Sequence, residues 1–225
     1  KGKYKGMLKE RTFRVHFVGE DSPAGDCDAV ETINIHYTGK EVRVKLCEGS
    51  VPDGMDDVTR YIANPSFEAD AKAGNKFTPQ GWTVDSPTAW WGINRGQGGG
   101  DPEATHGSYI FGVWDESNAL HAQISQTISN LPKGNYRLCV DMHASNSHSA
   151  TRVGNQCLFV NDAVVYFRDQ VSRPGVGDSY PMQTLMLNFV QDKDNTPITI
   201  GVATDGAPSE TWFKIDNFRL YRAAE

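Results

Sequence analysis

The sequence predicts an all-β chain, on three observations. Runs of alternating apolar and polar residues recur along its 225 residues, and helical apolar spacing is almost absent. Turns rich in Gly, Pro and Asn separate these runs at short intervals. Two motifs, at residues 64–68 and 212–221, bracket the larger part of the chain. We expect them to be the first and last strands of one β-sandwich and to lie side by side.

Residues 1–50 predict part of a β-sandwich, with strands at 11–18, 29–37 and 42–46. In the first of these strands, Phe13, Val15 and Phe17 alternate with polar residues. Three amphipathic strands bury little apolar surface, so a unit of this size is marginally stable alone. We therefore expect it to be the tail of a larger sandwich, in a chain that is a piece of a longer protein, or to lean on the residues that follow.

Residues 51–60 are rich in Gly, Pro and acidic side chains, which predicts a linker. Residues 61–225 predict a jelly-roll β-sandwich. Its expected strands lie at 81–84, 107–114, 119–128, 135–144, 155–167, 182–190, 198–203 and 211–221. Residues 85–106, glycine-rich near their end, predict a long loop.

The last strand changes the parity of its apolar residues. Phe213 and Ile215 alternate on one face, whereas Phe218 and Leu220 fall on the other. One extra residue in a strand reverses the faces of all that follow. The sequence therefore predicts a β-bulge at Asp216 and Asn217.

Composition excludes several classes of function. The net charge of −6 argues against binding to nucleic acid or to an anionic membrane surface, since both need an excess of Lys and Arg. No apolar run is long enough to span a bilayer. The four cysteines lack CxxC spacing, which argues against a zinc site. Cys139 and Cys157 are expected to fill the core, and the redox state of Cys27 and Cys47 is left open.

No catalytic motif is present in the sequence. It contains no HExxH, GxSxG or phosphate-binding loop. Its adjacent acids, such as Asp56 and Asp57, diverge on an extended chain, whereas glycoside hydrolysis needs two carboxyls facing each other about 5 to 10 Å apart. We expect this chain not to be an enzyme.

Tryptophans in predicted loops indicate a carbohydrate site. A sugar ring presents an apolar C–H face and a rim of hydroxyls, so its site needs a flat indole beside polar donors and acceptors. Trp90 and Trp91 are adjacent, so one is expected to face inward and one outward. Trp82 and Trp212 are predicted to lie in the core. The candidate sugar-binding residues are Trp90, Trp91, Arg95, Trp114, Asp115, Asn118, His143, Asn146 and Arg152. The last three belong to a polar stretch that could also be an ordinary hairpin loop.

Four motifs make the larger part resemble the galactose-binding-like jelly rolls that serve as carbohydrate-binding modules. They are Asn64-Pro65-Ser66-Phe67-Glu68, Gly81-Trp82, residues 126–136 and Ile215-Asp216-Asn217-Phe218-Arg219-Leu220-Tyr221. The resemblance implies a glycan partner and a structural Ca²⁺ bound by Glu68 and Asp216 with help from Asn64. Ca²⁺ takes six to eight oxygen ligands, which acids and loop carbonyls can supply. The alternative is that both acids are solvated or paired with Lys72, Lys76 or Lys214.

Residues 4–13 and 37–42 resemble the end of the C-terminal β-domain of family-31 glycoside hydrolases. This resemblance implies an α-glycosidase whose catalytic domain lies upstream in the same chain and which is periplasmic or secreted. The expected function is then non-catalytic recognition of a glycan, which keeps the enzyme near its substrate. The alternative is a structural module that braces the catalytic domain and binds no sugar.

Overall fold

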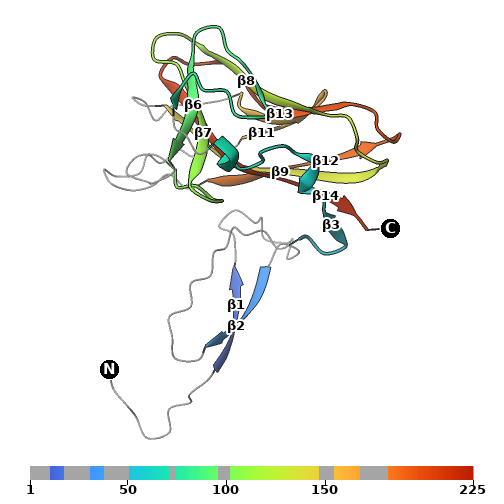
Figure 1. Cartoon of the computed structure of the whole chain (residues 1–225). Coiled ribbons are helices and arrows are strands. Elements are labelled where there is room, and N and C mark those ends of the chain that lie inside the picture. The colour runs from blue at the N-terminus through green and yellow to red at the C-terminus, as the bar shows by residue number, and fades with distance from the viewer. Residues whose placement is uncertain are drawn as a thin grey trace, which may run out of the picture. The chain divides into compact units, whose positions relative to one another are not determined.

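The computed structural model describes residues 11–17, 31–37, 51–70, 74–95, 102–146, 155–167 and 182–224. The chain divides into two compact units, 1–46 and 47–225 (Figure 1). In the first unit, β1 (Arg11–Phe17) pairs antiparallel with β2 (Glu31–Tyr37), with Phe13 opposite Ile35. Two predicted strands are thus confirmed, and the third, at 42–46, lies outside the described residues.

The second unit contains two antiparallel sheets that form the layers of a sandwich (Figure 1). The five-stranded sheet has the order β11 (Ala163–Tyr166), β10 (Cys157–Val160), β13 (Ile198–Ala207), β8 (Leu120–Ile128), β5 (Thr83–Asp85). The seven-stranded sheet has the order β12 (Gln183–Gln191), β9 (Gly134–Asn146), β14 (Thr211–Ala223), β7 (Tyr109–Trp114), β6 (Trp90–Arg95), β4 (Gly74–Asn75), with β3 (Met55–Asp57) also paired to β14. The predicted all-β sandwich is confirmed.

Helix is confined to two single turns in the described part of the chain, η1 (Thr59–Tyr61) and η2 (Glu68–Asp70). Neither could cross a lipid bilayer.

The two bracketing motifs meet in the core between the sheets. The ring centroids of Phe67 and Phe218 lie 6.4 Å apart, and Trp82 lies 4.7 Å from Phe218. The backbone N–H of Phe218 donates to the carbonyl of Pro65 at 2.9 Å. All three rings are buried, which confirms the expected proximity of the motifs and the core position of Trp82. Residues 64–68, expected to be a strand, instead form turns that lead into η2. Asn64 and Phe67 have φ values of 48° and 61°, which an extended strand does not allow.

The predicted β-bulge is present in β14. Its register against β9 shifts between Asp216 and Arg219. Asn217 has a φ of 55°, a left-handed conformation that Asn tolerates better than most residues. The bulge turns Phe218 and Leu220 toward the same core that Ile215 enters, and all three are fully buried.

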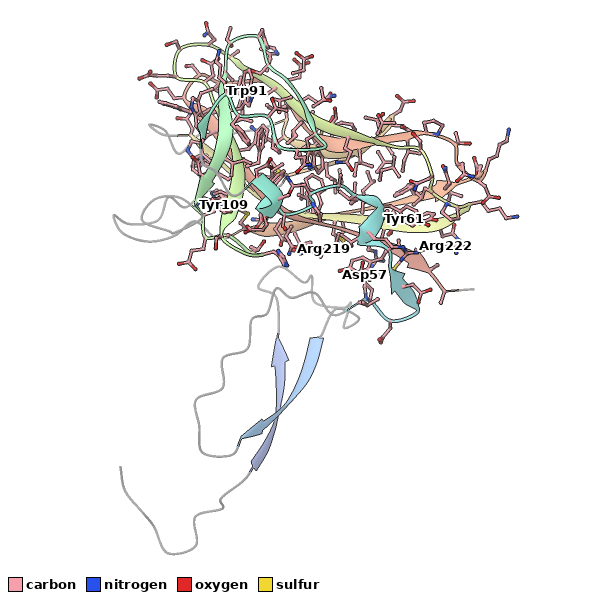
Figure 2. The ribbon with its side chains drawn as sticks, viewed as in Figure 1. Asp57, Tyr61, Trp91, Tyr109, Arg219 and Arg222 are labelled. Carbon is pink, nitrogen blue, oxygen red and sulfur yellow. The ribbon has the colours of Figure 1, made fainter. Side chains whose placement is uncertain are left out.

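Two further sequence predictions were wrong. Residues 55–57, expected in a linker, form β3, where Asp57 lies opposite Tyr221 of β14 (Figure 2). Residues 90–95, expected in a loop, form β6, which pairs with β7. In β6, Trp91 and Ile93 pack toward the core, and Gly92 lies opposite Gly112 of β7. These segments become strands because β14 and β7 pair with them, a cause that local sequence does not contain.

Cys139 and Cys157 are buried free thiols, which confirms their predicted role in packing. Burial raises the pKa of both thiols. Cys27 and Cys47 lie outside the described residues.

Candidate carbohydrate-binding face

Three tryptophans lie side by side across neighbouring strands of the seven-stranded sheet. Trp90 is opposite Trp114 on β7, and Trp114 is opposite Trp212 on β14. Directly opposite residues project from the same face of a sheet. Val113 and Phe213, which follow the other parity, belong to the core, so the three tryptophans lie on the outer face. We call them the tryptophan row.

The members of the tryptophan row differ in exposure. Trp114 is 37% exposed and Trp90 is half-buried, whereas Trp212 is buried. Trp212 was predicted in the core, but it is buried on the opposite face of the sheet. There its ring packs 5.5 Å from that of His143, measured between centroids. His143 is also buried, so this predicted sugar ligand supports Trp212 from the side.

Lys214 lies on the same face, two residues after Trp212. Its side chain crosses Gly112 so closely that a Cβ on Gly112 would lie 2.7 Å from Lys214 Cδ. The ammonium then reaches 5.8 Å from the centroid of the Trp90 ring, within cation–π range. The sequence analysis did not place Lys214 beside the tryptophans. The available signal was its i+2 spacing from Trp212, but that spacing carries meaning only once the face of Trp212 is known.

Trp91 is the inward member of the adjacent pair. It packs against the core, and Lys76 Nζ lies 5.3 Å above its ring (Figure 2). Its indole N–H is buried and has no acceptor among the described residues. The expectation of one inward and one outward tryptophan is confirmed. Arg152 and the side chain of Arg95 lie outside the part of the structure that is described.

Asp115 and Asn118 form a hydrogen-bonded loop directly after Trp114. Oδ1 of Asp115 accepts the backbone N–H of Ser117 at 3.0 Å and of Asn118 at 2.8 Å, and its other oxygen accepts the Thr88 hydroxyl. Burial acts to raise the pKa of Asp115, but these hydrogen bonds hold it below its ordinary value. Asp115 is therefore an ionised group that shapes the loop, whereas Asn118 is exposed.

Asn146 plays a similar role on the other side of the tryptophan row. It is buried, and its amide donates to the carbonyl of Ser209 at 2.8 Å and to the hydroxyl of Thr211 at 3.2 Å. Because Thr211 begins β14, these bonds secure the loop that leads into Trp212. The structure thus places Asn146 as support for the face.

Glu68 and Asp216 both bind the turn at residues 105–109. Oε1 of Glu68 accepts the backbone N–H of Ser108 and of Tyr109, each at 2.7 Å. Oδ2 of Asp216 accepts the backbone N–H of Thr105 and His106, each at 2.8 Å. The two motif acids therefore lie at one turn, which supports their predicted proximity.

Asp216 is fully buried next to a second acid, Asp141. Burial raises the pKa of Asp216 to about 7 against the effect of its backbone hydrogen bonds, and the charge of Asp141 adds to the rise. Asp141 behaves oppositely: burial acts to raise its pKa, but a bidentate pair with Arg219 at 2.7 and 2.8 Å lowers it. Asp141 is thus paired with a cation, whereas no cation pairs with Asp216 among the residues that the structure describes.

A buried acid without a cation partner is the feature that fits a calcium ion at this turn. Glu68 fits as well, because its Oε2 has no hydrogen-bond partner among the described residues. Asn64 fits less well, since its amide already bonds the N–H of Ala69 and the carboxylate of Asp70. Within the described ranges, no cluster of three acidic, His or Cys side chains forms a metal site. Calcium at this turn thus stays a prediction that involves chiefly Glu68 and Asp216.

No protein-family model matches the chain, and no curated protein matches it. Among solved structures, it is similar to a cyclase from Fischerella sp. TAU, with 19% identity and a TM-score of 0.52 over 76% of this chain and 99% of that chain. It is also similar to an apo form of a cyclase from Fischerella sp., with 18% identity and a TM-score of 0.53 over 76% of this chain and 98% of that chain. The structure of TmCBM61 in complex with beta-1,4-galactotriose has 20% identity and a TM-score of 0.43 over 72% of this chain and 97% of that chain. Identities this low relate folds, not functions.

Proposed function

We propose that the second unit binds a glycan through the tryptophan row, without catalysis. The observation that carries this proposal is the exposure of Trp114 beside Trp90 on the outer face. Large aromatic side chains are mostly buried in folded proteins, so an exposed indole next to a second one needs an explanation. Together they offer a flat apolar surface that matches the C–H face of a sugar ring.

Polar groups suited to sugar hydroxyls lie close to the tryptophan row. Asn118 is exposed in the loop after Trp114. Lys214 is buried, and its ammonium lies near the Trp90 ring, so it supports the face from within. Asp115 and Asn146 hold the neighbouring loops through internal hydrogen bonds. A rigid supporting layer of this kind preorganises a binding face and reduces the entropy lost on binding.

The proposed affinity is weak. One stacked indole buries roughly 100 Å² of apolar surface, worth about 2.5 kcal/mol. Association costs at least about 4 kcal/mol, so hydrogen bonds must supply the remainder. We expect dissociation constants on the order of micromolar to millimolar. A module tethered to an enzyme works at that strength because linkage raises the effective concentration.

The finer proposal is that the module holds an α-glycosidase near its glycan substrate and carries a structural Ca²⁺ at Glu68 and Asp216. The resemblance of residues 4–13 and 37–42 to a family-31 C-terminal domain supports the choice of enzyme. The competing proposal is a brace without sugar binding. The exposure of Trp114 next to the exposed polar side chain of Asn118 favours sugar binding over this alternative.

The test is a titration of intrinsic tryptophan fluorescence in the full chain with a panel of neutral oligosaccharides, together with electrophoresis through gels containing soluble polysaccharides. Trp114→Ala should weaken retention at least about tenfold. Met186→Ala is the matched control, because Met186 is exposed on the outer side of β12 in the same sheet but outside the row. A wild-type chain that no polysaccharide retards would support the brace instead.

A further inference from the structure

A hollow opens on the five-stranded sheet of the sandwich, and its volume is about 310 Å³. That volume is at the lower end of the range for small-molecule sites, roughly 300 to 1,000 Å³. Its lining comes from β10, β11, β13 and the residues beside them: Asn155, Cys157, Tyr166, Ala203, Thr204 and Asp205. No residue of the tryptophan row contributes to it. We call it the Tyr166 hollow.

The strand register explains why the hollow exists. Cys157 lies opposite Tyr166 on one side and Ala203 on the other. The next residues along, Leu158 and Val202, are in the core, so this trio lies on the outer face of the five-stranded sheet. Two small side chains beside a large ring leave a depression with the ring as its wall. Tyr166 is 58% exposed, so the ring is available for stacking.

A carboxylate stands at the rim of the hollow. Oδ1 of Asp205 lies 2.6 Å from Nδ1 of His121, its neighbour across the strands, and the Asp205 side chain is 94% exposed. The amide of Asn155 donates to the backbone carbonyl of Asp205 at 3.0 Å. His121 thus orients the carboxylate of Asp205, and Asn155 holds the backbone of the same residue. The carboxylate oxygens stay accessible as hydrogen-bond acceptors.

We propose that the Tyr166 hollow is a second sugar-binding site, in which one ring stacks on Tyr166 and donates hydroxyl hydrogen bonds to Asp205. The carboxylate disfavours anionic ligands, and the polar rim disfavours purely apolar ones. This inference rests on the proposed glycan recognition. It adds a second contact for the same class of ligand on a separate sheet, which raises the avidity for a polysaccharide.

The experiment compares the wild-type full chain with Tyr166→Ala, Asp205→Asn, Trp114→Ala and Val164→Ala. Val164 is the matched control because it is exposed on the same face of β11 but does not line the hollow. Tyr166→Ala should weaken retention on polysaccharide gels about threefold to tenfold, the value of an aromatic contact. Asp205→Asn should weaken it by a similar factor of about threefold to tenfold, because a neutral amide oxygen accepts hydroxyl hydrogen bonds more weakly than a carboxylate. Val164→Ala should leave retention unchanged. Thermal melts verify that each variant is folded.

A second readout separates the two sites. Calorimetry with an oligosaccharide should show two sites per wild-type chain and one in Tyr166→Ala, while the tryptophan fluorescence response persists. Loss of retention in Trp114→Ala with full retention in both hollow variants would overturn the second site and leave glycan recognition intact. Loss in the hollow variants alone would support the hollow and overturn the tryptophan row. Failure of the wild-type chain to bind any polysaccharide would overturn both.

Discussion

Trp90 and Trp114 lie directly opposite each other on β6 and β7, and both face away from the core. The strand β6 directly precedes the glycine-rich residues 96–100, and Gly92 of β6 lies opposite Gly112 of β7. The same neighbours bring Lys214 over the sheet toward Trp90. The rings of Trp90 and Trp114 and the ammonium of Lys214 therefore form one continuous surface.

The first prediction concerns coupling between the two indoles. Trp90→Ala and Trp114→Ala should each weaken oligosaccharide affinity about tenfold, and the double variant should lose less than the product of the two. The reason is that opposed rings contact adjacent parts of one ligand. Calorimetric titration of the four proteins measures this coupling. Strictly multiplicative losses would mean that the rings act independently.

The second prediction concerns Gly112. In Gly112→Ala the new methyl group would displace the Lys214 side chain, whose flexible stem can move away from Trp90. We expect the free energy of unfolding to change by no more than about 1 kcal/mol, because the displaced group is flexible. Sugar affinity should fall clearly. Urea denaturation and fluorescence titration measure the two effects, and Lys214→Met, which keeps the stem, separates charge from shape. Unchanged affinity in both variants would remove Lys214 from the site.

The third prediction concerns Glu68 and calcium. Glu68→Ala leaves the N–H groups of Ser108 and Tyr109 without their acceptor. Because Ser108 is exposed and its N–H can bond water, the loss should cost about 0.5 to 1.5 kcal/mol of stability. Calcium should raise the melting temperature of the wild type but not of this variant. Glu116→Ala, which removes an exposed acid from another loop, is the control. A chelator that leaves the wild-type melting temperature unchanged would eliminate the metal.

The fourth prediction concerns pH. The pKa of Asp216 is about 7 in the folded state and near 3.8 when unfolded, so the folded state holds a proton that the unfolded chain has lost between these values. The free energy of unfolding should therefore fall as pH rises from about 4 to 7, by at most about 4 kcal/mol. Asp141 acts in the opposite sense at lower pH, because its pKa is lowered and its contribution is lost as pH falls.

Urea denaturation in chelator between pH 4 and 8 measures this effect, with Asp216→Asn as the comparison. The variant should lack the fall in stability across that window. Bound calcium should also remove it, since a cation keeps Asp216 ionised. A wild-type profile that stays flat in chelator would show that Asp216 is ionised without help.

Local pattern was sufficient for much of the fold. Alternation located β8, β9, β12 and β13, because strands with one buried face repeat every second residue. The parity change between Ile215 and Phe218 located the bulge, since the apolar residues before and after it must enter the same core. The strands β3 and β6 lacked such a pattern and were missed, because pairing with β14 and β7 makes them strands.

The candidate site shows where local reasoning stops. Asp115, His143 and Asn146 have the right chemistry for a sugar, yet the structure uses them to hold loops and to support Trp212. Tyr166 and Asp205 carried no signal at all, because a hollow forms only when three strands bring a ring beside two small side chains.

By itself, the sequence determined that this chain is an all-β sandwich, that its bracketing motifs meet, and that Trp90 and Trp91 point in opposite directions. Tertiary structure decided which of the two faces outward and whether Trp212 joins the core or the opposite face. The physical reason is that alternation defines two faces of a strand, but only the sheet packed against one of them decides which face is buried.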